Sequence, residues 1–122
     1  MNVIDYQYQS IAVVDDEEDI VTLFTDALEE NDYQVMGFTN SLLFLDYVRE
    51  YPDRFDLIIV DYKMSPMKGC ELTKEIVAIN PKIKMILITA YDDIKNNDLN
   101  LEIVKKPITI TKLLQIIQQQ LD

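Results

Sequence analysis

Five short apolar runs constrain the fold of this 122-residue chain more than any other feature. The runs occupy residues 11–14, 35–38, 57–60, 85–88 and 101–104. They are rich in β-branched residues and mostly apolar at successive positions, which is typical of strands buried on both faces of a parallel sheet. A chain of this length can bury roughly two thirds of its surface in one domain. We therefore expect a single domain over residues 1–122, with a short N-terminal extension over about residues 1–9.

Segments with helical periodicity separate the apolar runs. Helical patterns begin near Ile20, Leu42, Leu72 and Ile110, and each carries an apolar stripe on one face. The segment 91–100 is short and polar, so it predicts only a stunted helix or a loop. Strands that alternate with helices predict a doubly wound α/β fold. We expect a five-stranded parallel sheet of order 2-1-3-4-5 with a shortened or missing fourth helix.

Carboxylate, hydroxyl and ammonium groups stand at the ends of four of the runs. Asp15 and Asp16 follow the first run, and Asp61 follows the third. Thr89 ends the fourth run and Lys106 closely follows the fifth. The carboxyl ends of parallel strands share one edge of a sheet, and ligands bind there at the point where the strand order reverses. We therefore expect these five side chains to converge.

The predicted cluster has the chemistry of a cation site that supports phosphoryl transfer. Three neighbouring carboxylates repel one another unless a hard divalent cation lies among them, which would be Mg²⁺, with Mn²⁺ as an alternative. An aspartate can act as a covalent nucleophile, and a cation and a lysine stabilise the charge that develops on phosphoryl oxygens. The acidic residues 17–19 are instead typical of a helix N-terminus.

Composition excludes several classes of function. The chain has 22 acidic against 11 basic residues, which argues against nucleic acid or anionic lipid as a direct partner. Histidine is absent, so Ser-His and Cys-His nucleophile pairs and a phosphohistidine carrier are excluded. Cys70 is the single cysteine, so there is no disulfide framework. With no membrane-spanning apolar run and no signal-peptide pattern, we expect a cytoplasmic protein.

Four motifs together resemble the receiver domains of two-component response regulators, over about residues 10–121. They are VVDDEEDI, LIIVDYKMSPMKG, ILITAY and KKP. The resemblance implies a flavodoxin-like fold and a single-domain phosphoprotein of a phosphorelay. It would catalyse its own phosphorylation and dephosphorylation without being an enzyme with an external product. A histidine kinase or histidine phosphotransferase would be the donor, and an unknown downstream protein would receive the signal by contact or onward phosphotransfer.

The resemblance also implies roles for the residues around the acceptor. Asp61 would be the phospho-acceptor, Asp16 a direct Mg²⁺ ligand, and Asp15 a residue that acts mainly through metal-bound water. The backbone carbonyl of Lys63 would be a further ligand. In this fold Lys63 and Tyr91 flank the phosphoryl group, and their long side chains predict a comparatively long-lived aspartyl phosphate because they obstruct an attacking water.

The remaining matches lie after the fourth and fifth runs. Thr89 matches the switch hydroxyl of the family, and Ala90 matches the small residue that follows it. Lys106 matches the lysine of the family site. Pro107 would be joined to Lys106 by a cis peptide bond, a geometry that is accessible before proline.

The sequence departs from the family pattern at three points, of which the second and third concern the output. Ser65 stands where these domains often have a proline, and Pro66 comes one residue later. Ile103 replaces the usual aromatic switch residue, so the coupled movement of a hydroxyl and a ring is not available in its usual form. Thr89 and Lys106 are also closer in sequence than usual. We therefore expect output through a non-standard face.

Two rival interpretations stay open at this stage. One is a receiver-like interaction module without phosphorylation, which Ile103 and the short fourth helix favour. The other is a haloacid-dehalogenase-type phosphatase, which would want a second aspartate at the position of Lys63. Ile20 and Ile116 are expected either to be buried at the edge of the core or to contact a helix of the phosphodonor. The sequence leaves the oligomeric state open.

Overall fold

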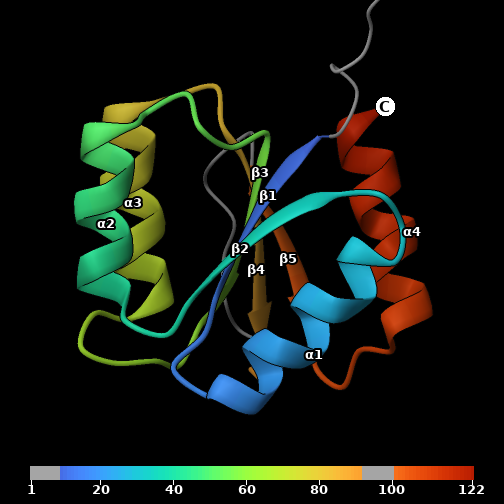
Figure 1. Ribbon diagram of the computed structural model, residues 1–122. Coiled ribbons are helices and arrows are strands. Elements are labelled where there is room, and N and C mark those ends of the chain that lie inside the picture. The colour runs from blue at the N-terminus through green and yellow to red at the C-terminus, as the bar shows by residue number, and fades with distance from the viewer. Residues whose placement is uncertain (1–8, 92–100) are drawn as a thin grey trace, which may run out of the picture.

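The computed structural model describes residues 9–91 and 101–122, and these form one sheet with helices on both faces (Figure 1). The strands are β1 (Ser10–Val14), β2 (Gln34–Phe38), β3 (Leu57–Asp61), β4 (Lys84–Thr89) and β5 (Leu101–Lys105). The helices of the described part are α1 (Glu18–Glu29), α2 (Ser41–Glu50), α3 (Gly69–Ile79) and α4 (Ile110–Leu121). Each apolar run forms a strand, extended by a residue at one or both ends.

All neighbouring strands of the sheet are parallel, in the order β2-β1-β3-β4-β5. This confirms the predicted flavodoxin-like, doubly wound sheet. The register places Val14 of β1 opposite Val60 of β3, and Thr89 of β4 opposite Lys105 of β5. The carboxyl ends of β1, β3, β4 and β5 are therefore level with one another.

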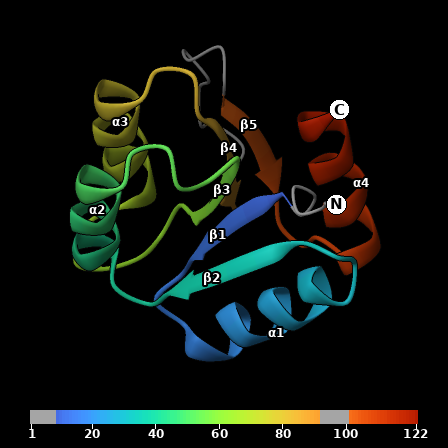
Figure 2. The same cartoon turned by 45° about the horizontal axis from the view of Figure 1, so that its top comes forward.

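Helices α2 and α3 cover one face of the sheet, and α1 and α4 cover the other (Figure 2). Two hydrophobic clusters fill the spaces between the layers. Alternate residues of β1 divide between them, since Ala12 and Val14 face α2 and α3, whereas Ile11 and Val13 face α1 and α4. Burial on both faces is the physical reason for uninterrupted apolar runs in the sequence.

The ends of the helices agree with local sequence signals. Asn40 caps α2, because its side-chain Oδ1 accepts hydrogen bonds from the backbone N–H groups of Leu42 and Leu43 at 2.9 and 3.0 Å. Glu18 and Asp19 lie exposed in the first turn of α1, where the helix dipole favours acids, as their position predicted.

Helix α3 begins unusually close to the end of β3. A Cβ atom on Gly69 would lie 2.3 Å from the carbonyl oxygen of Asp61 and 2.8 Å from Cα of Tyr62. Only a glycine permits this approach, and the Gly69 N–H donates a hydrogen bond of 2.9 Å to the carbonyl of Tyr62. Residues 62–68, which connect β3 to α3, are thereby folded into a compact loop at the point where the strand order reverses.

Two expectations fall outside the described residues. The predicted stunted helix or loop lies almost wholly in residues 92–100, and the predicted N-terminal extension lies almost wholly in residues 1–8. Among the described helices, none combines the length and apolar character needed to cross a membrane.

Candidate functional site

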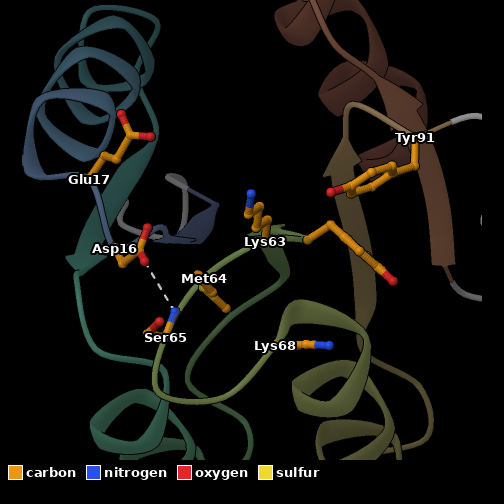
Figure 3. Close-up of a pocket in the computed structure, with 8 residues that line it drawn as sticks. Asp16, Glu17, Lys63, Met64, Ser65, Lys68 and Tyr91 are labelled. Carbon is orange, nitrogen blue, oxygen red and sulfur yellow. Dashed lines mark hydrogen bonds between the residues drawn. The ribbon is translucent and has the colours of Figure 1, made fainter.

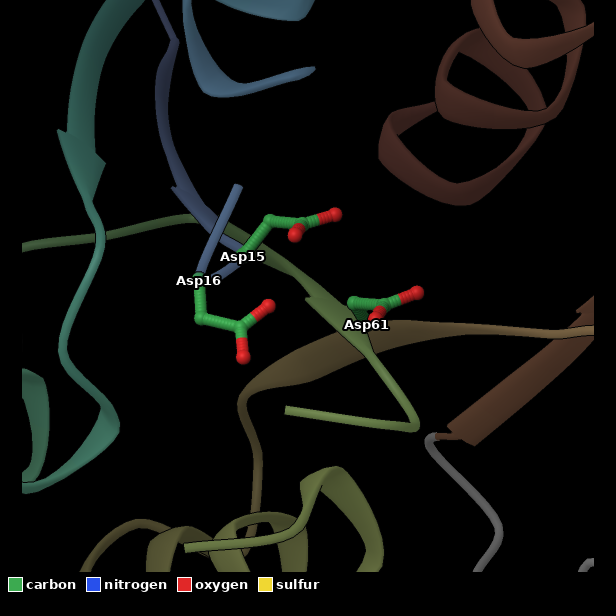
Figure 4. A group of neighbouring side chains, drawn as sticks. All are labelled: Asp15, Asp16 and Asp61. Atoms are coloured by element: carbon green, nitrogen blue, oxygen red, sulfur yellow. The ribbon is translucent and has the colours of Figure 1, made fainter. Parts of the chain in front are cut away.

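The three predicted carboxylates lie together at the carboxyl edge of the sheet (Figure 4). Asp15 and Asp16 come from the end of β1, and Asp61 is the last residue of β3. One carboxylate oxygen of each lies within 4.8 Å of those of the other two. Asp15 and Asp61 are buried, with 6% and 7% of their surfaces exposed, whereas Asp16 is exposed. The parallel register brings them together, because β1 and β3 are neighbours that end at the same level.

A hydrogen-bond donor orients each carboxylate on the β1 side. The backbone N–H of Glu17 donates to Oδ1 of Asp15 at 2.9 Å. The backbone N–H of Ser65 donates to Oδ2 of Asp16 at 3.1 Å. A carboxylate has several lone pairs on two oxygens, so each side chain can still offer an oxygen to a cation.

Lys106 provides the positive charge of the site. Its Nζ lies 2.7 Å from Oδ1 of Asp61, and its backbone N–H donates to the carbonyl of Thr89 at 2.7 Å. The pairing of β5 with β4 therefore brings the lysine to Asp61. The Lys106–Pro107 peptide bond is cis. Burial acts to lower the pKa of Lys106, but its hydrogen bond to Asp61 and the attraction of Asp61 and Asp15 outweigh burial and raise it.

Burial raises the pKa of Asp15 from 3.8 to about 6. The hydrogen bond from Glu17 opposes this shift, and the nearby charge of Asp61 adds to it. With all three carboxylates ionised, the Lys106 ammonium leaves two negative charges uncompensated. Hard oxygen ligands with this charge fit a divalent cation such as Mg²⁺.

Thr89 is the last residue of β4, the strand that pairs with β3. Thr89 is 1% exposed at the end of β4, and its Oγ1 accepts a hydrogen bond of 3.0 Å from the backbone N–H of Tyr91. Ala90 between them is exposed. The ring of Tyr91 meets that of Tyr62 edge to face, with 5.5 Å between the centroids.

A cleft of about 1050 Å³ opens beside the acids (Figure 3). Lys63 lies in the middle of this cleft, with Asp16 and Glu17 on one side and Tyr91 on the other. The two residues expected to flank a phosphoryl group therefore line one space. Lys63 is exposed and belongs to the loop between Asp61 and α3.

A second cavity, of about 540 Å³, lies on the α1 side of Asp61 and is mostly apolar. Ile20, Leu23 and Phe24 of α1 form one wall, and Ile108 belongs to the segment before α4. Ile20 is half-buried and Leu23 is 51% exposed. Ile116 is instead buried in the cluster beneath α1 and α4, which agrees with burial at the edge of the core.

Ile103 is half-buried and packs against the cluster that faces α2 and α3.

Sequence reasoning did not predict the contacts of three residues that shape the site. Ser41 is fully buried in α2 and its Oγ accepts a hydrogen bond of 2.8 Å from the N–H of Met67. Tyr62 contacts Tyr91, and Ser65 contacts Asp16. Only Ser65 gave a signal, because unlike the usual proline it keeps an N–H group.

The sheet and its acidic edge agree with the comparisons with known proteins. A sequence model described as the response regulator receiver domain matches residues 11–118. The chain therefore belongs to the response regulator receiver domain family. Receiver domains are signalling modules of two-component systems that bind Mg²⁺ at an acidic site. This assignment sets aside the haloacid-dehalogenase-type alternative.

Three similar proteins illustrate the extent of the match. Sporulation initiation phosphotransferase F of Bacillus subtilis (strain 168) is 33% identical over 86 residues, which cover 70% of this chain and 68% of that protein. Transcriptional regulatory protein ZraR of Klebsiella oxytoca is 38% identical over 84 residues, covering 69% of this chain but only 18% of that protein. A CheY-like receiver domain protein from Methanospirillum hungatei JF-1 superimposes with a TM-score of 0.85, at 25% identity and 95% coverage of both chains.

Proposed function

We propose that this protein accepts a phosphoryl group on Asp61 in a Mg²⁺-dependent transfer from a phosphohistidine of a histidine kinase or histidine phosphotransferase. The observation that carries the proposal is the position of Asp61. It is grouped with two other carboxylates and lies 2.7 Å from the Lys106 ammonium. Family membership supports a phospho-accepting response regulator, and the transfer changes the contacts that the protein makes with an unknown downstream protein.

The proposed chemistry is an in-line displacement at phosphorus. A carboxylate oxygen of Asp61 attacks, the bond between phosphorus and the histidine nitrogen breaks, and the imidazole leaves with its electron pair and takes up a proton. Asp15, Asp16, Asp61 and the backbone carbonyl of Lys63 would hold Mg²⁺, or Mn²⁺ in its place. When bound, the ion supplies positive charge that stabilises the phosphoryl oxygens.

Two further groups complete the site. Lys106 already touches the acceptor carboxylate, so its ammonium can donate to a phosphoryl oxygen after transfer. The hydroxyl of Thr89 accepts a hydrogen bond from the Tyr91 N–H, and its own proton remains available to donate to a second oxygen. Because residue 103 is isoleucine, a reorientation of Thr89 toward the phosphoryl group is not paired with an inward swing of an aromatic ring at that position.

The apolar cavity beside Asp61 is the place where the donor protein would dock. An exposed leucine at its rim, Leu23, and the half-buried Ile20 offer apolar area next to the acceptor. An amphipathic helix that carries the phosphohistidine would bury this area as it brings the phosphorus to Asp61.

The acceptor can be tested by intact mass after incubation with acetyl phosphate and Mg²⁺. We expect one added phosphoryl group in the wild type and none in Asp61→Asn or in the presence of a chelator. Asp53→Asn, an exposed aspartate outside the site, is the matched control and should be labelled like the wild type. If the wild type gains no phosphoryl group with Mg²⁺ present, the interaction module without phosphorylation becomes the better description.

The docking face can be tested with two leucine variants. Leu23→Asp should slow transfer from a phosphorylated histidine phosphotransferase, while labelling by acetyl phosphate stays unchanged. Leu43→Asp is the control, because Leu43 is 63% exposed on α2, on the opposite face of the sheet. Equal transfer rates for both variants would place the donor elsewhere.

A further inference from the structure

Ser65 departs from the family pattern, and the departure creates a hydrogen bond in the site. Its backbone N–H donates to Oδ2 of Asp16 at 3.1 Å, drawn as a dashed line in Figure 3. A proline at this position would have no N–H to donate. The contact joins the loop after the acceptor to a carboxylate at the end of β1, although the two residues are 49 positions apart in sequence.

Hydrogen bonds also hold the C-terminal end of the loop that carries Ser65. Met67 donates its backbone N–H to the fully buried Oγ of Ser41 at 2.8 Å, which ties the loop to α2. Gly69 donates its N–H to the carbonyl of Tyr62 at 2.9 Å, which closes the loop on itself. The Ser65 N–H is therefore presented to Asp16 from a loop with fixed ends.

Asp16 is the carboxylate that needs such support. Asp15 and Asp61 are 6% and 7% exposed and are surrounded by protein, whereas Asp16 is exposed. An exposed aspartate can occupy several rotamers, and fixing one of them on cation binding costs conformational entropy. A backbone donor on one carboxylate oxygen holds the side chain in one orientation and leaves the other oxygen open.

We propose that the backbone N–H of Ser65 positions Asp16 for the divalent cation and so strengthens cation binding at the site. This inference rests on the proposed function, because it takes Asp15, Asp16 and Asp61 as the cation site. The donor is neutral, so it orients the carboxylate without contributing a second positive charge that would repel the cation. Ser65 is a positioning residue, and it acts through Asp16.

The test compares Mg²⁺ dissociation constants, measured by calorimetric titration of the full chain, for two variants of one residue. Ser65→Pro removes the N–H, and Ser65→Ala keeps it. The residue precedes Pro66, a setting that already favours the extended backbone that proline adopts. We expect Ser65→Pro to bind Mg²⁺ about threefold to tenfold more weakly than the wild type, the range that the net contribution of an ordinary hydrogen bond gives. Ser65→Ala should remain within about twofold of the wild type.

If Ser65→Pro fails to fold, the amide proton resonances of the protein test the inference instead. In the metal-free wild type, the amide proton resonance of Ser65 should shift clearly when Asp16 is replaced by alanine, while that of Met67 stays in place. Ser41→Ala should give the reverse pattern, because Met67 bonds to Ser41. An unmoved Ser65 amide in Asp16→Ala would overturn the inference.

The outcomes separate this inference from the proposed function. If the wild type binds Mg²⁺ and accepts a phosphoryl group, but Ser65→Pro and Ser65→Ala bind the ion equally well, the inference alone is wrong. If the wild type binds no divalent cation, both the proposed function and this inference are overturned.

Discussion

At the scale of single residues, Asp15 shows how the site lowers folding stability when no cation is bound. Its carboxylate is buried beside Asp61, and burial raises its pKa to about 6. The folded chain therefore holds a proton on Asp15 at pH values where the unfolded chain, with a pKa near 3.8, has released it. Folding stability from this group is present below pH 4 and is lost as the pH rises through 6.

We expect Asp15→Asn to raise the free energy of unfolding of the metal-free protein above pH 6 by about 3 kcal/mol, since the pKa rises from 3.8 to about 6 and one pKa unit corresponds to about 1.4 kcal/mol. The difference from the wild type should shrink as the pH falls to 4 and should vanish below about pH 3, where Asp15 is protonated in both states. Urea denaturation at pH 4 and pH 7 measures it. Asp26→Asn, on the exposed surface of α1, is the control for loss of a carboxylate elsewhere. A difference that does not depend on pH would contradict this account.

We also expect single residues to set the lifetime of an aspartyl phosphate on Asp61. Lys63 lies in the middle of the cleft beside the acids, and Tyr91 lines one side of it. Their replacement by alanine should speed dephosphorylation roughly fivefold, because an attacking water then reaches a near-attack position more easily. Loss of label over time, followed by intact mass, gives the rate. Lys68→Ala, at another point of the same cleft, should have a smaller effect, and an unchanged rate in the double variant would rule out obstruction.

At the scale of secondary-structure elements, the junction between β3 and α3 determines the geometry of the acceptor. Gly69 lets the first turn of α3 lie against the backbone of Asp61 and Tyr62. Its replacement must move the backbone that carries the acceptor, because the atoms in the way are main-chain atoms.

We expect Gly69→Ala to lower the free energy of unfolding by about 2 kcal/mol, as overpacking typically does, and to weaken Mg²⁺ binding as well. Gly37→Ala is a matched control, since its Cβ would meet a side-chain atom of Val21 at 2.4 Å rather than main chain. That variant should leave Mg²⁺ affinity unchanged. Thermal denaturation and metal titration of both variants provide the comparison, and equal Mg²⁺ affinity in the two would argue against a role for the junction.

The strands and their order were the part of the structure that the sequence predicted best. The five apolar runs predict the strands and their order because burial on both faces leaves a continuous signal. The positions of Asp15, Asp61 and Lys106 follow from that order. The contacts of Ser41 and Tyr62 do not follow, because they depend on the path of a loop whose hydrogen bonds join residues far apart in sequence.

At the scale of the whole molecule, the excess of acidic residues lowers the stability of the metal-free protein. The chain carries a formal net charge of −11 at pH 7, and self-repulsion of this kind disfavours the compact state. Ordinary salt screens such repulsion over a Debye length of roughly 10 Å at 0.1 M, whereas a bound divalent cation neutralises the cluster directly.

Mg²⁺ should therefore raise the melting temperature more than NaCl of equal ionic strength. At ten times the dissociation constant the bound ion should add about 1.4 kcal/mol to the free energy of unfolding. Asp16→Asn should lose this additional effect and keep the response to NaCl. Scanning calorimetry of both proteins in the two salts makes the comparison, and identical responses to Mg²⁺ and NaCl in the wild type would argue against a specific ion site.

The order of the strands also has a consequence for protein synthesis. The chain is made from the N-terminus, so Asp15, Asp16 and Asp61 leave the ribosome before Lys106 does. Strands β1, β2 and β3 can pair with one another without β5, but the ammonium reaches the acceptor only when β5 has joined β4. A nascent or truncated chain that lacks β5 thus has the three carboxylates without the lysine that pairs with Asp61.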